Sequence, residues 1–173
     1  MGDDCCTNMG PIMNMIKETI PDVYIHSIML GNSTKEDVQA SFRGNVNDQI
    51  QQACTLLRND TKLASGFYGL GFSQGGLFLR AVLQRCTDLD MKRLITIGAP
   101  HRGVSEAPVF KGNNTIAKIS KGSINYFVYT SVVQRRIVQA QYFNNPKKQE
   151  DYKKYNKFLP DINNEVSVRN TID

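Results

Sequence analysis

Apolar residues recur at helical spacing in three stretches of the first hundred residues. One begins at Pro11 and ends at Pro21, one covers residues 46–57, and one runs from Gln74 to Cys86. Three more continuous apolar runs, residues 23–30, 66–72 and 93–97, are typical of buried parallel strands. The alternation of helix and strand predicts an α/β fold with right-handed crossovers, a mainly parallel sheet and helices on both faces.

The second part of the chain has a less regular pattern. Residues 105–130 mix polar and apolar positions with Pro108, Gly112 and Gly122, residues 132–140 have helical spacing, and Asn145-Pro146 ends that pattern. Residues 31–35 are predicted to be a loop, and a lysine-rich stretch, residues 147–157, leads to residues 158–162. We therefore expect a single domain over residues 1–173, with a possible cap or insertion at about residues 105–165.

Composition and charge narrow the class of protein. The chain has 173 residues, 40% hydrophobic, 21% charged and a formal charge of +5, which is ordinary globular composition. No apolar run is long enough to span a membrane, and the first residues lack the basic and apolar regions of a signal peptide. The lysine-rich stretch interleaves five lysines with acidic and tyrosine residues and has no arginine, which favours a solvated face over nucleic-acid or lipid binding.

The segment Gly71-Phe72-Ser73-Gln74-Gly75 carries the candidate chemistry. A serine between two glycines, after a strand and before a helix, is the pattern of a nucleophile elbow. We predict that Gly71 and Gly75 must lack a Cβ, that Ser73 is the nucleophile, and that the Gln74 amide forms half of an oxyanion hole at the helix start. The alternative is a glycine-rich turn with a solvated serine.

Neither histidine is predicted to be the base. His26 lies in a predicted strand, where a structural role is more common. His101 follows the strand 93–97 and is expected to shape the mouth of the site, because α/β-hydrolases place serine, acid and histidine in that order.

The cysteines and sequons indicate an oxidising compartment. Cys5 and Cys6 are adjacent, whereas Cys54 and Cys86 lie near the ends of two predicted helices, and no CxxC or histidine pair suggests zinc. A bond between Cys54 and Cys86 would close a loop of 32 residues. Three glycosylation sequons point the same way and begin at Asn32, Asn59 and Asn113.

Taken together, these residues resemble the palmitoyl-protein thioesterase family. The matching stretches run nearly from end to end and are residues 1–6, 37–47, 71–76, 78–82, 84–86, 132–142 and 158–163. The resemblance implies an α/β-hydrolase fold, with Ser73 as nucleophile, the amides of Gln74 and Met1 as the oxyanion hole, and disulfides Cys5–Cys6 and Cys54–Cys86. It also implies a lysosomal or secreted glycoprotein that acts on S-acylated proteins and their fatty acyl chains without a metal or organic cofactor.

Two departures from the family pattern matter. The family has a further cysteine pair in the segment corresponding to residues 105–122. It also begins with a signal peptide and a first strand ending in His-Gly before Met1, and it continues past Asp173 to supply the acid and the histidine. We therefore expect a fragment that is incomplete at both ends and inactive alone. A non-catalytic lipid- or protein-binding segment and a lipase or carboxylesterase acting on oxygen esters remain alternatives.

Overall fold

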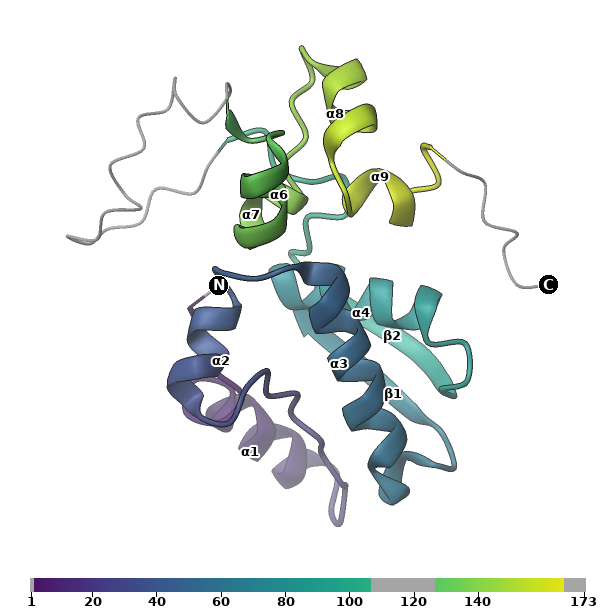
Figure 1. The fold of residues 1–173 in the computed structure, drawn as a ribbon. Helices are drawn as coiled ribbons and strands as arrows, with labels where there is room; N and C mark the ends of the chain where they lie inside the picture. The colour runs from purple at the N-terminus through teal and green to yellow at the C-terminus, as the bar shows by residue number, and fades with distance from the viewer. Residues whose placement is uncertain (1, 107–126, 167–173) are drawn as a thin grey trace. The chain divides into compact units, whose positions relative to one another are not determined.

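The computed structural model describes residues 2–106 and 127–166, which divide between two compact units. The first unit is Met1–Ala99 and the second is Pro100–Asp173. Figure 1 shows the elements of each unit along the chain. Among the described residues, no helix is both long and apolar enough to cross a bilayer.

A β-α-β unit forms the centre of the first unit, as the sequence predicted. Strands β1 (Phe67–Phe72) and β2 (Met91–Ile97) pair in parallel, and α4 (Gln74–Arg85) connects them and contacts both. The register places Gly71 opposite Thr96 and Phe72 opposite Ile97. The carboxyl end of β1 therefore leads directly into the start of α4, the arrangement that a nucleophile elbow requires.

One face of this small sheet is packed against a helix, and the other face is exposed among the described residues. Gly69 and Gly71 lie on the face packed against α4 and are buried. Tyr68, Ile95 and Ile97 lie on the other face and are 68%, 54% and 51% exposed. Within the described residues α4 thus covers one face, and a helical layer on the second face stays a prediction.

Helix α3 (Val46–Asn59) packs beside α4 through the apolar stripe that the sequence predicted. Its buried residues are Val46, Ile50, Ala53, Cys54 and Leu57. Asn45 begins the helix, and its side chain accepts a hydrogen bond from the amide of Asn47. A disulfide joins Cys54 of α3 to Cys86 at the end of α4, and the 3₁₀ helix η1 (Thr61–Leu63) leads on to β1.

Two predictions for residues 23–40 were wrong. Residues 23–30 form no strand, because they have no paired strand among the described residues; the Leu30 amide donates to the side chain of Asp37 instead. Residues 34–40, predicted in part as loop, form helix α2 (Thr34–Ala40), whose cap is Ser33 accepting from the amide of Glu36 at 3.3 Å. Helix α1 (Gly10–Thr19) forms as predicted but buries none of its residues.

The second unit is helical in the part that the structure describes. The predicted helix over residues 132–140 is two helices, α6 (Ser131–Arg136) and α7 (Val138–Gln141), because Ile137 takes an extended conformation, φ −117° and ψ 112°. Helices α8 (Gln149–Tyr155), within the lysine-rich stretch, and α9 (Leu159–Ile162) complete it. Its buried cluster contains Val128, Ala140 and Phe143. Most of the segment expected to lack the family's cysteine pair lies outside the described residues.

Candidate active site

Ser73 occupies the bend between β1 and α4. Its backbone has φ 48° and ψ −122°, in a region that non-glycine residues rarely adopt and that costs about 1–3 kcal/mol. Its amide donates to the carbonyl of Ile97 at 2.8 Å, which continues the parallel ladder past β1, and its carbonyl accepts from the amide of Gly76 at 3.1 Å. The surrounding structure therefore holds the strained residue, and Ser73 is exposed.

Glycine is required on both sides of the bend, although one of the two predicted positions was wrong. A Cβ on Gly71 would lie 2.5 Å from the Cα and 2.6 Å from the nitrogen of Gly76. A Cβ on Gly76 would lie 2.7 Å from the Cβ of Ala99 and 2.9 Å from the carbonyl oxygen of Gly71. A Cβ on Gly75, by contrast, would meet no atom of the described residues within 4 Å. The close approach is between Gly71 and Gly76, because the third residue of α4 faces back onto the strand.

Gln74 begins α4, so its backbone amide lies at the positive end of the helix dipole, a few atoms from the serine hydroxyl. Its side chain is also held, because Nε2 donates to the carbonyl of Ser41 at 3.0 Å. The predicted role of the amide as an oxyanion-hole donor fits this position. The other predicted donor, the amide of Met1, lies outside the described residues.

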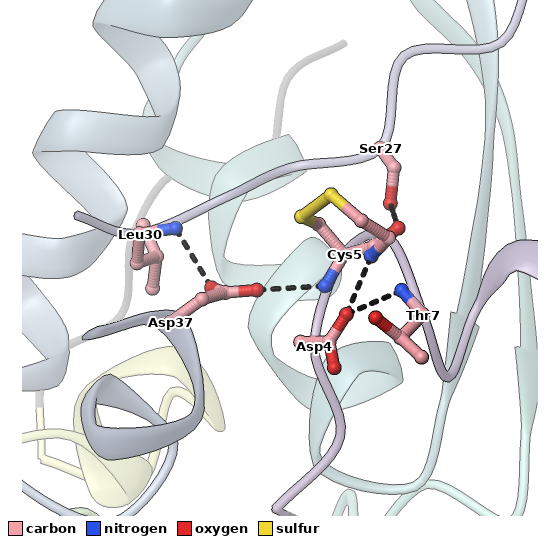
Figure 2. Close-up of a disulfide and its surroundings, with 7 residues drawn as sticks. Asp4, Cys5, Thr7, Ser27, Leu30 and Asp37 are labelled. Atoms are coloured by element: carbon pink, nitrogen blue, oxygen red, sulfur yellow. Dashed lines mark hydrogen bonds between the residues drawn. A yellow bond between two sulfur atoms is a disulfide. The ribbon is translucent and has the colours of Figure 1, made fainter. Parts of the chain in front are cut away.

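The segment after Met1 is fixed by hydrogen bonds to α2. The amide of Gly2 donates to Oγ of Ser41 at 2.9 Å. Figure 2 shows Asp37, a buried carboxylate, accepting from the amide of Cys5 at 2.7 Å and from the amide of Leu30 at 2.8 Å. Sequence reasoning assigned no role to Asp37 or Ser41, although both lie in the stretch 37–47 that resembles the family. Their bonds to Cys5 and Gly2 reach more than thirty positions along the chain, and the local signal was limited to the capping pattern at Ser33.

Cys5 and Cys6 form the adjacent disulfide that the resemblance implied. Asp4 stabilises the turn that contains it, since Oδ1 accepts from the amides of Cys6 and Thr7 at 2.8 and 2.5 Å (Figure 2). These two amides, that of Thr7 first, hold the pKa of the Asp4 carboxyl below its usual value. Ser27 donates to the carbonyl of Cys5 at 2.7 Å and secures the other side of the turn.

No metal site is supported within the described residues. The close group of potential ligands there is Asp4, Cys5 and Cys6. Both sulfurs are bonded to each other and cannot act as thiolates, which is the form that binds metal. The prediction that no metal or organic cofactor is needed stays a prediction.

His26 does not lie in a strand, and its predicted structural role stays a prediction. Its Nδ1 is 2.6 Å from Oδ2 of Asp60, which also accepts from the hydroxyl of Tyr24 at 2.6 Å. Tyr24 first, and then His26, lower the pKa of Asp60, and Asp60 in turn raises the pKa of Tyr24. His101 is half-buried in the second unit, and its predicted place at the mouth of the site stays a prediction.

The sequons are exposed where they can be described. Asn32 and Asn59 are both on the surface, and Asn113 lies outside the described residues. Glycosylation of these three residues stays a prediction.

Comparison with known proteins gives one consistent result. Residues 1–172 match the family model described as palmitoyl protein thioesterase. The chain is 44% identical over 167 residues to palmitoyl-protein thioesterase 1 of Caenorhabditis elegans, covering 95% of this chain and 56% of that protein. It is 41% identical over 143 residues to a palmitoyl-protein thioesterase-dolichyl pyrophosphate phosphatase fusion of Schizosaccharomyces pombe, covering 82% of this chain and 23% of the fusion.

A third relative is the lysosomal thioesterase PPT2 homolog of Drosophila melanogaster, 31% identical over 124 residues, or 71% of this chain and 42% of that protein. The chain thus spans about half the length, or less, of these curated relatives.

Proposed function

The chain belongs to the palmitoyl-protein thioesterase family, and from this premise we propose that the whole protein is a serine hydrolase that cleaves the thioester between a fatty acyl group and a protein cysteine. The observation that carries the proposal is the strained Ser73, exposed at the tip of the bend between β1 and α4. A solvated serine in an ordinary turn does not require φ 48° or the contact between Gly71 and Gly76.

The proposed reaction follows from the chemistry of an activated serine. The Ser73 hydroxyl gives its proton to a histidine and attacks the thioester carbonyl carbon. The tetrahedral oxyanion is stabilised by the amides of Gln74 and Met1, and it collapses when the carbon–sulfur bond breaks. The cysteine thiolate takes the proton from the imidazolium, and water then hydrolyses the acyl ester on Ser73 to release the fatty acid.

The acid and histidine of the triad are proposed to follow this segment in the whole protein. In α/β-hydrolases the acid and histidine come after the nucleophile in the chain, in that order. The one histidine before Ser73, His26, is paired with Asp60. The length of the curated relatives leaves room for both groups.

We further propose a lysosomal or secreted glycoprotein. Two disulfides are stable in an oxidising compartment, and the exposed Asn32 and Asn59 are accessible for glycan attachment. One relative carries the word lysosomal in its name.

The test is turnover by the protein expressed at the full length of its reading frame. We expect hydrolysis of a palmitoyl-cysteine peptide to exceed hydrolysis of the matched palmitoyl-serine ester, and Ser73→Ala to abolish the thioester reaction. Ser65→Ala, which changes an exposed serine in the turn before β1, is the control and should keep full activity. Preference for the oxygen ester would favour a lipase, and absence of any turnover would favour a binding protein.

A further inference from the structure

Ser41, immediately after α2, contacts two parts of the candidate site that are far apart in sequence. Its hydroxyl accepts the amide of Gly2 at 2.9 Å, and its carbonyl accepts Nε2 of Gln74 at 3.0 Å. The same hydroxyl donates to the carbonyl of Val38 at 2.7 Å. Because the hydroxyl has a single proton, this donation leaves its lone pairs to accept from Gly2.

The backbone on both sides of this contact is tightly constrained. Gly2 has φ +78°, and a Cβ there would lie 3.2 Å from Cζ of Phe42, the neighbour of Ser41. Two hydrogen bonds therefore tie the end of α2 to the peptide unit that follows Met1 and to the first residue of α4, and a third orients the Ser41 hydroxyl against Val38. All of these residues belong to the first unit.

We propose that Ser41 is a positioning residue for the oxyanion hole, a role that rests on the proposed function. An oxyanion hole works when two amides point at one position, about 2.7–3.1 Å from the developing negative charge. One predicted amide belongs to Gln74 and the other to Met1, on separate segments of the chain. Ser41 bonds to Gln74 and to the residue after Met1, so it fixes the spacing between these segments.

The main test compares Ser41→Ala and Ser41→Thr in the full-length protein. Active sites are first counted by complete reaction with an alkyl fluorophosphonate, so that kcat refers only to folded enzyme. Removing one oxyanion donor lowers kcat by about 100- to 1000-fold, and displacing the donor lowers kcat by less. We therefore expect Ser41→Ala to lower kcat per titrated site by about 10- to 100-fold, with KM changed by less than about two-fold. The threonine variant keeps the hydroxyl and should recover most of kcat.

The control is Thr55→Ala. The hydroxyl of Thr55 also donates to a helix carbonyl, that of Gln51 at 3.0 Å, but Thr55 lies on the exposed side of α3. This variant should keep the wild-type kcat.

The fluorophosphonate forms a tetrahedral adduct that resembles the transition state, so the rate constant of labelling should fall in Ser41→Ala together with kcat.

The proposal is overturned if Ser41→Ala has a kcat per titrated site close to wild type, even if it unfolds at a lower temperature. It is also overturned if Thr55→Ala loses as much kcat, or if Ser41→Thr fails to recover activity while titrating fully. Failure of the proposed function would be seen separately, as thioester turnover that survives Ser73→Ala, and the Ser41 role would then fall with it.

Discussion

The contact between Gly71 and Gly76 gives the sharpest test of how the elbow is built. In Gly76→Ala the new Cβ would lie 2.7 Å from the Cβ of Ala99, 2.9 Å from the carbonyl oxygen of Gly71 and 3.0 Å from the Cβ of Thr96. All three atoms belong to backbone or to short side chains that cannot rotate away. The start of α4 must therefore move off the sheet.

The loss of folding stability in Gly76→Ala can be compared with the stability of Gly75→Ala, the matched variant one residue earlier. Forcing a methyl group into a packed site costs about 1–3 kcal/mol. In Gly75→Ala the Cβ meets no atom within 4 Å in the part of the chain that the structure describes, and alanine is favoured over glycine in a helix by up to about 1 kcal/mol. We expect Gly76→Ala to destabilise the fold by about 1–3 kcal/mol and Gly75→Ala to leave stability unchanged or slightly raised.

Thermal unfolding of the full-length protein measures this difference. At about 2–4 °C per kcal/mol, Gly76→Ala should lower Tm by roughly 2–12 °C, whereas Gly75→Ala should not lower it. Equal losses of Tm in the two variants would refute the packing argument. An unchanged Tm in Gly76→Ala would do the same, because α4 would then have free space above β1.

Two further predictions concern bonds away from the elbow. Replacing Cys54 and Cys86 together by alanine should destabilise the protein by roughly 3–4 kcal/mol, the loop entropy of a 32-residue separation. In urea unfolding, the wild type with reductant should approach the stability of the variant. A stability difference that persists after reduction would contradict this prediction. Asp60→Asn should lower Tm at neutral pH, where the lowered pKa of Asp60 stabilises the folded state. That Tm difference should begin to shrink as the pH falls through about 4, where the Asp60 carboxylate of the unfolded chain takes up a proton, and should be lost at lower pH, where the folded carboxylate with its lowered pKa is protonated as well. A difference independent of pH would show that its bonds to Tyr24 and His26 do not depend on charge.

The sequence predicted the parts of the fold whose patterns are local. The stripe of α3, the strands β1 and β2 and the start of α4 follow directly from residue spacing and from Gly71-Phe72-Ser73. Residues 23–30 were predicted wrongly because an apolar run does not reveal whether a strand is available to pair with it. In the structure Asp37 takes up the Leu30 amide instead.

The site was predicted to a similar extent. The position of Ser73 follows from the motif, but the motif does not tell which later glycine faces the strand; Gly76 does, and Gly75 does not. Ser41 could not be found, because its contacts with Gly2 and Gln74 bridge 39 and 33 residues and leave no periodic signal.

The proposed nucleophile can be tested most directly by trapping the acyl-enzyme. Full-length protein mixed with excess palmitoyl-cysteine peptide is quenched in acid during turnover, and its proteolytic peptides are analysed by mass spectrometry. We expect one palmitoyl ester, on the peptide that contains Ser73, and none in Ser73→Ala. An acyl group on a different residue, or turnover by Ser73→Ala, would contradict it.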